Sequence, residues 1–322
     1  MKDRVLILGA AGFIGRRLVA ALQETDWAVP ICGLHRAPLS IGLVQQAVLD
    51  ATDRAALMRV MASVEGVVNC VAGSAETIMA TAKNLSSVSR QMSCPPRIVH
   101  LSTMSVYGSV SGSVYEDSPL KGDTGAYALA KLQAERLVMR SPEVVILRPG
   151  CVYGPGGTQW SEYIARLLRG HRLGDLGSSG DGYCNLVHVD DVVAAILKAL
   201  RIPGVAGEVF NLGTPAPPTW NEYFVSFARA LGAVPIRRIS RRQLLLEARF
   251  LAPPLKAADW ASDLAQLNLQ IPTAITSPLL RLWRQEIRLD VTKAEAVLGI
   301  SWTPTEVGLR DTAALLSLSE AR

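Results

Sequence analysis

Residues 5–15, VLILGAAGFIG, run from four apolar residues directly into a glycine cluster. Gly9, Gly12 and Gly15 follow at three-residue spacing, and the apolar residues after them recur with helical periodicity. This pattern predicts a buried strand, a tight turn and a helix. In such a turn the first glycine permits the bend, the second lets a diphosphate approach the backbone and the third lets the helix pack on the strand. The missing side chains therefore predict a dinucleotide site, with the phosphates at the helix N-terminus.

The composition of the 322-residue chain, 49% hydrophobic, indicates a globular protein with a sizeable core. The uncharged apolar stretches are shorter than the roughly 18 to 20 residues that cross a bilayer, so we expect no membrane span. Five scattered cysteines without CxxC spacing favour buried thiols in a reducing cytoplasm, and they give no reason to expect a metal site.

The net charge of +5 is far below the clustered charge of a nucleic-acid-binding protein. One basic cluster stands out, at Arg237, Arg238, Arg241 and Arg242. We interpret it as a solvated helix face, with contact to an anionic substrate or a membrane surface as the alternative.

Short apolar runs alternate with helical patterns through the first two hundred residues or so, which is typical of a parallel sheet covered by helices on both faces. The expected strands are Val5–Leu8, Val29–Cys32, Ala47–Leu49, Gly66–Val71, Arg97–Leu101 and Val144–Leu147. The expected helices lie near Gly12–Gln23, Arg54–Val64, Glu76–Gln91 and Tyr127–Arg140. We therefore predict an α/β domain with a doubly wound parallel sheet, a Rossmann fold.

After Pro149 the sequence becomes rich in glycine and proline, and it mixes short helical patterns with loops. We expect residues 1–152 to form the dinucleotide-binding domain, with residues 185–213 returning to it. Residues 153–184 and 214–322 are expected to form a smaller, mixed α/β substrate domain.

The glycine spacing GxxGxxG resembles the fingerprint of the short-chain dehydrogenase/reductase superfamily. There an acidic residue ends the second strand, about eighteen positions after the third glycine, and binds the ribose hydroxyls. This chain has Gly33 at that position, followed by His35 and Arg36. A missing carboxylate and two cationic side chains favour a 2′-phosphate, so we predict NADP(H), with NAD as the alternative. The competing interpretation is that Arg36 only begins a surface loop.

Tyr127 and Lys131 form a YxxxK motif, whose spacing places both side chains on one helical face. A phenol is a poor base at neutral pH, but a neighbouring ammonium and an oxidised nicotinamide favour the phenolate. Such a base suits hydride transfer from a secondary alcohol, because the hydroxyl proton must leave as well. We expect Lys131 to lower the pKa of Tyr127 and to hold the nicotinamide ribose.

Upstream, residues 100–108, HLSTMSVYG, resemble the superfamily's strand-end segment that finishes in VYG. In that segment the hydroxyl three positions before the valine assists the tyrosine. The resemblance implies that Thr103 orients the substrate oxygen, with Ser102 and Ser105 as competitors.

Further motifs extend the resemblance over nearly the whole chain, to the extended branch of the superfamily, the NAD-dependent epimerase/dehydratase family. They are residues 116–120, 147–156, 185–192 and 290–294. The cofactor contacts that the motifs and the resemblance together indicate are Gly9, Ala11, Gly12, Phe13, Ile14, Gly15, His35, Arg36, Asp50, Ala51, Val71, Ala72, Gly73, Leu101, Tyr127, Lys131, Pro149, Gly150 and Val152. Asp50 resembles the residue that meets the adenine edge, or it caps the following helix. His188 is expected to be structural, joining the two domains.

Departures from the family pattern narrow the expected chemistry. Met104 and Ser105 replace the acidic pair with which the family's dehydratases eliminate water, so dehydration is not expected. Cys184 replaces an arginine that clamps the substrate diphosphate. Ile78 replaces an asparagine near the catalytic region, although Asn84 remains.

Three arginines of the C-terminal part, Arg281, Arg284 and Arg288, could replace the missing clamp. Their spacing of three and then four residues predicts a single basic stripe on one helix, for which a plain surface stripe is the alternative.

The leading hypothesis is an NAD(P)-dependent oxidoreductase that interconverts a secondary alcohol and a ketone, acting on a small molecule that could be a nucleotide sugar. The first alternative is a nucleotide-sugar 4-epimerase that retains its cofactor, and the second is an NADP-binding sensor without turnover. The resemblance also implies a homodimer through the helices near Glu76–Gln91 and Tyr127–Arg140, with Leu132 and Val138 expected as exposed apolar positions.

Overall fold

A seven-stranded parallel sheet forms the centre of the computed structural model, which describes residues 2–35, 45–264 and 274–320. The strand order is β10-β7-β5-β4-β1-β2-β3. The strands are β1 (Asp3–Leu8), β2 (Ala28–Leu34), β3 (Gln45–Val48), β4 (Gly66–Asn69), β5 (Arg97–Leu101), β7 (Val144–Pro149) and β10 (Val209–Leu212). The order reverses between β1 and β4, where a doubly wound sheet opens a crevice at its carboxyl edge. The predicted fold class is confirmed.

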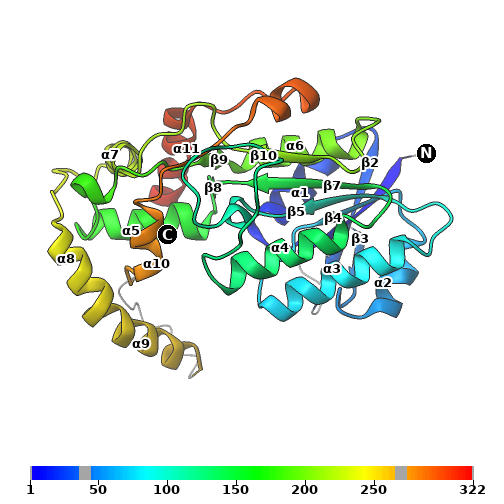
Figure 1. The fold of residues 1–322 in the computed structure, drawn as a ribbon, viewed down its shortest axis with the longest axis horizontal. Helices are drawn as coiled ribbons and strands as arrows, with labels where there is room; N and C mark the ends of the chain where they lie inside the picture. The colour runs from blue at the N-terminus through cyan, green and yellow to red at the C-terminus, as the bar shows by residue number, and fades with distance from the viewer. Residues whose placement is uncertain (1, 36–44, 265–273, 321–322) are drawn as a thin grey trace.

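Helices cover both faces of this sheet (Figure 1). On one face α1 (Phe13–Gln23) and α6 (Val189–Arg201) share an apolar core with the sheet. On the other face α2 (Arg54–Met61), α3 (Ala75–Ser89) and α4 (Ala126–Val138) do the same. Because both faces are covered, the strands are apolar nearly throughout.

Helix α4 buries residues that we expected to be exposed. Leu132 is 2% exposed and packs in the C-terminal core, and Val138 is fully buried against α3 and the sheet. The prediction of an exposed apolar face at these two positions is wrong, because α4 lies between the sheet, α3 and the segment after β5. The exposed apolar side chain on the body of α4 is Leu129, and Met139 follows directly after the helix.

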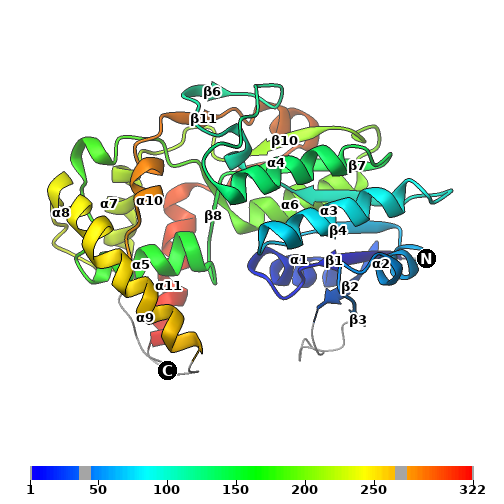
Figure 2. The same ribbon diagram turned by 60° about the horizontal axis from the view of Figure 1, so that its bottom comes forward.

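The remaining elements build a second, smaller body beside the sheet (Figure 2). In its core, five of the buried aromatic side chains pack against one another, namely Trp220, Tyr223, Phe224, Phe227 and Trp283. These elements and the short connecting pieces are η1 (Met104–Tyr107), β6 (Gly112–Val114), β8 (Cys151–Tyr153), η2 (Thr158–Glu162), α5 (Tyr163–Arg169), η3 (Gly177–Ser179), β9 (Leu186–His188), α7 (Trp220–Ala230), α8 (Arg241–Leu246), η4 (Glu247–Leu251), α9 (Ala252–Leu264), α10 (Ser277–Leu282), β11 (Ile287–Leu289), η5 (Ala294–Leu298) and α11 (Thr305–Glu320).

Two small parallel strand pairs tie distant parts of the chain together. β6 pairs with β11, and β8 pairs with β9.

The residue-by-residue division into two domains stays a prediction. Within the described ranges, no helix combines the length and the apolar character that a membrane crossing requires.

Candidate functional site

The glycine turn between β1 and α1 has the geometry of a phosphate cradle. Gly9 has a φ of +79°, and a Cβ placed there would meet the backbone of Cys70 at 3.0 Å. A Cβ on Gly15 would collide with the Gly9 carbonyl oxygen, so the helix packs directly on the turn. Gly12 caps α1 without a side-chain hydrogen bond, and both Ala11 and Gly12 are exposed. The first amide groups of α1 are therefore open to an anion at the carboxyl edge of the sheet.

The end of β2 lies beside the loop after β3. His35 Nδ1 lies 3.4 Å from Oδ2 of Asp50, and Oδ1 of the same carboxylate accepts hydrogen bonds from the amide and hydroxyl of Thr52. These Thr52 bonds, chiefly, lower the pKa of Asp50, so the carboxylate stays charged. Asp53, not Asp50, caps α2, which removes the capping alternative for Asp50. Arg36 lies outside the described residues.

Asn84, the asparagine that remains from the family pattern, holds the loop after β3. Its side-chain amide donates to the carbonyl oxygens of Ala51 at 3.2 Å and Thr52 at 2.8 Å. It therefore fixes the loop that carries Asp50. Ile78 is 2% exposed and belongs to the apolar core, so it has no polar role.

The loop after β4 contains Val71, Ala72 and Gly73, of which the last two are exposed. It is anchored by Asn69, whose side chain accepts from the Val71 amide and contacts His100 Nδ1 at 3.0 Å. Burial lowers the pKa of His100 to about 3, and the charge of Lys131 adds to that shift. A neutral imidazole thus joins the ends of β4 and β5.

Tyr127 and Thr103 meet at the carboxyl end of β5. Thr103 is 8% exposed and its hydroxyl caps the short helix η1 by accepting from the Ser105 amide at 3.2 Å. Although 46% of the Tyr127 side chain is exposed, burial of its hydroxyl raises the phenol pKa, and a hydrogen bond with the Thr103 side chain partly offsets this. The phenol is therefore protonated at neutral pH.

Lys131 lies one turn along α4 from Tyr127, and it is almost fully buried. Its ammonium donates to the carbonyl oxygens of Leu101 at 2.9 Å and Val71 at 3.2 Å. The pKa of Tyr127 is raised here, chiefly by burial, and the lowering of that pKa by Lys131 stays a prediction. The ammonium itself is held by the ends of β4 and β5.

The buried ammonium should make stability depend on pH. Burial lowers the pKa of Lys131 to about 8. Between that pH and about 10.4, the unfolded chain binds a proton that the folded chain lacks, so the free energy of unfolding rises with pH, by at most about 1.4 kcal/mol per unit. Below pH 8 both states are protonated and this contribution is constant. Urea unfolding should show that wild type gains stability relative to Lys131→Met as pH rises through this window. If the difference in unfolding free energy between wild type and Lys131→Met does not change with pH, the lowered pKa of Lys131 is contradicted.

A buried polar network lies behind Thr103. Ser102 donates to a Glu135 carboxylate oxygen at 2.7 Å, and Arg148 forms an ion pair with the same carboxylate. Arg148 also donates to the Tyr107 hydroxyl at 2.9 Å and to the Glu116 carbonyl at 2.8 Å. Because its hydroxyl is committed to Glu135, Ser102 is a poor competitor for the role of Thr103.

Sequence reasoning missed the Glu135–Arg148 pair. Glu135 follows Lys131 by four residues, so it lies on the same face of α4. Arg148 is a charge inside the buried strand β7, and such a charge requires a partner. These two signals together could have identified the pair.

The segment after β7 contains Pro149, Gly150 and Val152. A Cβ on Gly150 would collide with the Asn185 carbonyl oxygen, and the Cys151 amide donates to that oxygen at 2.7 Å. Asn185 in turn holds β11 through the Ile287 carbonyl. The missing side chain at Gly150 therefore lets the segment after β7 lie close to the Asn185 backbone. This role is separate from the cofactor contact proposed for Gly150.

His188 is buried between the two bodies, as the N-cap of α6. Its Nδ1 accepts from the Asp190 amide at 3.4 Å, and its ring lies edge-on to Tyr153 at a centroid distance of 5.3 Å. Burial, chiefly, lowers its pKa. These contacts describe a packing residue.

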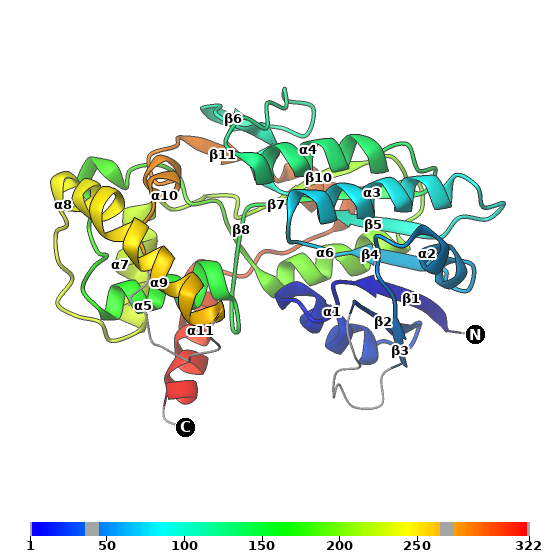
Figure 3. The ribbon, with the colours of Figure 1, turned by 90° about the horizontal axis from the view of Figure 1, so that it is seen from below.

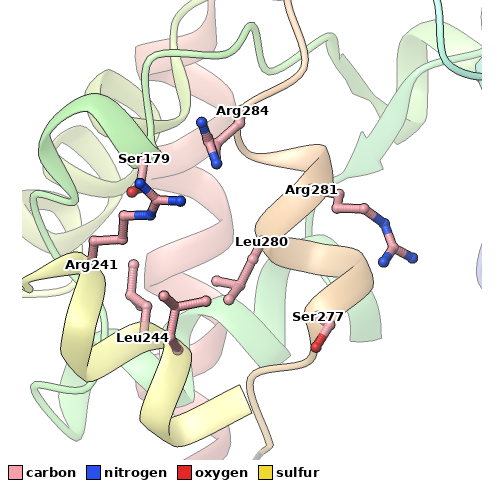
Figure 4. A pocket seen from close by; sticks show the side chains of 8 residues that line it. Ser179, Arg241, Leu244, Ser277, Leu280, Arg281 and Arg284 are labelled. Atoms are coloured by element: carbon pink, nitrogen blue, oxygen red, sulfur yellow. The ribbon is translucent and has the colours of Figure 1, made fainter. Parts of the chain in front are cut away.

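A separate cavity of about 480 Å³, to whose lining Tyr127 does not belong, lies in the smaller body (Figure 4). It is lined by Ser179, Arg241, Leu244, Leu245, Ser277, Leu280, Arg281 and Arg284. Arg241 and Arg284 point toward Ser179, whereas Arg281 points away from them. Within the described ranges, the guanidinium groups of Arg241 and Arg284 have no hydrogen bond or ion pair. Two unpaired guanidinium groups make this cavity suited to an anion.

The predicted single stripe of Arg281, Arg284 and Arg288 is wrong. α10 ends at Leu282, and Arg288 lies on β11 with its guanidinium 3.8 Å from the ring centroid of Tyr183. The interpretation of the basic cluster also needs correction, because Arg241 lines the cavity and Arg238 pairs with Asp175 at 2.7 Å.

Comparisons with known proteins agree on one family. The model of the "NAD dependent epimerase/dehydratase family" matches residues 5–213. The chain is 33% identical over 141 residues to Protein YeeZ of Escherichia coli (strain K12), which covers 44% of the chain and 48% of YeeZ, about half of that relative. It is 29% identical over 253 residues to the dTDP-4-keto-6-deoxy-D-glucose reductase of Streptomyces niveus, which covers 74% of the chain and 82% of the reductase.

A solved structure shows the same fold over nearly the whole chain. The UDP-glucuronic acid 4-epimerase of Bacillus cereus, in complex with UDP-glucuronic acid and NAD, superposes with a TM-score of 0.73 at 18% identity. The superposition covers 98% of this chain and 99% of that one. At this identity the likeness concerns the fold alone.

Proposed function

The chain belongs to the NAD dependent epimerase/dehydratase family, and from that premise we propose that it reduces a ketone to a secondary alcohol with a nicotinamide cofactor. The proposal rests on one observation above all. Tyr127, hydrogen-bonded to Thr103, lies on α4 at the same carboxyl edge of the sheet as the open glycine turn. Phenol, hydroxyl and glycine turn thus lie at one edge of the sheet.

The residues of the turn fit a dinucleotide, because Ala11 and Gly12 are exposed and the α1 amides next to them have no side-chain cap. When bound there, the nicotinamide supplies the hydride. Thr103 orients the substrate oxygen by hydrogen bonding. Tyr127 gives its hydroxyl proton to that oxygen as the carbonyl carbon is reduced, and solvent returns the proton. With its pKa raised, the phenol of Tyr127 is protonated at neutral pH and can serve as the proton donor for the reduction.

We propose that Lys131 holds the ends of β4 and β5 in place and contacts the ribose next to the nicotinamide. We propose that the cofactor contacts the residues that the sequence motifs and the family resemblance indicated. In this family setting, the cavity with Arg241 and Arg284 would receive an anionic part of the substrate, such as the diphosphate of a nucleotide sugar. Met104 and Ser105 carry no carboxylate, so water elimination is not proposed.

A screen of ketones against NADPH oxidation tests this function. Nucleotide-linked keto sugars and simple ketones are each mixed with the protein, and absorbance at 340 nm is followed. We expect stoichiometric NADPH loss with at least one anionic ketone. Protein that carries bound dinucleotide and converts a nucleotide sugar without added cofactor would instead support the retained-cofactor 4-epimerase. A cofactor-binding sensor would show binding and no turnover.

NADPH should bind more tightly than NADH. His35 follows the end of β2, and Gly33 stands where an acidic residue at the strand end would repel a 2′-phosphate; the Asp50 carboxylate nearby is in contact with His35 Nδ1. One charge-assisted contact contributes about 1.5 to 3 kcal/mol, which is roughly a tenfold to hundredfold difference in Kd. Fluorescence titration with each cofactor measures it. Equal affinities, or tighter NADH binding, would refute the NADP(H) preference.

We propose that the protein forms a homodimer. We also propose that it is located in the cytoplasm. Leu129 and Met139 offer exposed apolar surface along and just after α4, in place of the two buried residues named from the sequence. The five cysteines are free thiols, as a reducing compartment requires. Light scattering that gives a monomer mass would reject the dimer.

A further inference from the structure

Helices α8, η4 and α9 form an arm along the outer side of the smaller body, far from the sheet (Figures 1 and 3). The arm is attached through one face, on which Leu244, Ala248 and Ala252 are buried. Its other side carries large apolar residues without cover from the described parts of the chain. Leu246, Phe250 and Leu251 are 56%, 62% and 54% exposed. We call these three residues the apolar patch.

Arginines surround the apolar patch. Arg242 and Arg249 are exposed on the same arm, and the Arg249 guanidinium lies 5.9 Å from the ring centroid of Phe250. The arm as a whole, residues 241–264, contains four basic and three acidic residues. Residues 242–251, which contain the apolar patch, carry Arg242, Arg249 and one acidic residue, Glu247. The Glu247 carboxylate pairs with Arg172, which follows α5 in the smaller body. The free charge beside the apolar patch is therefore positive.

This positive charge favours one of two surfaces that could cover the apolar patch, a second copy of the chain or an anionic surface. A second copy of the chain in a twofold dimer would bring the same arginines face to face, which opposes association. An anionic surface would instead pair with them. A protruding helix that exposes leucine and phenylalanine beside arginine is typical of elements that lie in the interface of a lipid bilayer.

We propose that the arm docks on the surface of an anionic phospholipid bilayer. Leu246, Phe250 and Leu251 enter the boundary between headgroups and acyl chains. Arg242 and Arg249 reach the lipid phosphates, since a long side chain can bury its stem and keep its guanidinium at the headgroups. The arm does not cross the membrane. Arg241 and Leu245, which line the cavity, are left to the proposed substrate site.

Vesicle flotation of the full-length protein tests the proposal. Vesicles of phosphatidylcholine alone are compared with vesicles that also contain phosphatidylglycerol. We expect binding to the anionic vesicles only, weakened by salt. The paired change Leu246→Ser with Phe250→Ser should lower partitioning about tenfold or more. The pair Arg242→Gln with Arg249→Gln should lower it about fivefold for each arginine.

A matched control lies on α11, where Leu315 is 44% exposed and Arg310 is exposed as well. Leu315→Ser with Arg310→Gln should leave vesicle binding unchanged. NADPH titration and circular dichroism of every variant report on folding and on the proposed reaction separately, so either proposal can fail alone. Absence of binding to anionic vesicles overturns the membrane proposal. So does self-association in solution that the paired serine variant abolishes, or equal binding by the arm and control variants.

Discussion

Replacing Tyr127 by phenylalanine is expected to lower turnover of a ketone substrate by about 10²- to 10⁴-fold. The variant keeps the ring and loses the hydroxyl that interacts with Thr103 and that would protonate the substrate oxygen. Burial already keeps this phenol protonated, so its proton is available when the carbonyl oxygen gains negative charge. Without it, a developing alkoxide would form beside Thr103 alone.

The dissociation constant of NADPH separates loss of chemistry from loss of the site. It should change by no more than about threefold in Tyr127→Phe, because the glycine turn is untouched. Tyr115→Phe is the matched control: Tyr115 is 51% exposed and has no proposed part in the reaction, so its turnover should equal that of wild type. A Tyr127→Phe variant that reduces the ketone within about threefold of the wild-type rate would remove Tyr127 as the proton donor.

Replacing Glu135 by glutamine is expected to lower the free energy of unfolding by about 3 to 5 kcal/mol. The side chains of Glu135 and Arg148 are 5% and 4% exposed. Removing the carboxylate charge leaves the Arg148 guanidinium buried without a counterion, and it weakens the acceptor of the Ser102 hydroxyl. The effect is large because solvent cannot reach the remaining charge.

An exposed pair provides the comparison for urea unfolding. Glu208 contacts Lys293 at 2.7 Å, with side-chain exposures of 45% and 34%. Glu208→Gln should cost at most about 1 kcal/mol, because water screens such pairs. If Glu135→Gln and Glu208→Gln destabilise the protein equally, the buried pair has no special part in holding the segment behind Thr103.

The parts of the site that depend on short stretches of backbone could be predicted from the sequence. At Gly9 and Gly15 the neighbouring backbone leaves no room for a Cβ. The three evenly spaced glycines of the sequence indicate this constraint. The strands and helices of the sheet follow from apolar periodicity in the same way. Tyr127 and Lys131 share a helix, so their spacing alone placed them on one face.

Features of the structure that depend on contacts between distant segments could not be predicted from local sequence patterns. Leu132 and Val138 look like exposed apolar positions until α4 is packed against its neighbours. In the cavity Arg284, from the turn after α10, lies beside Arg241 of α8, whereas Arg288 belongs to a strand. The direction of the Lys131 ammonium depends on two carbonyls at the ends of different strands. Helical spacing contains none of this information.

The most direct test is a crystal structure of the protein with NADP⁺ bound. The account predicts that the diphosphate lies on the amide groups at the start of α1 and that the nicotinamide ring contacts the Tyr127 hydroxyl. A ring bound away from Tyr127, or a side chain of the protein filling the place beside that hydroxyl, would contradict it.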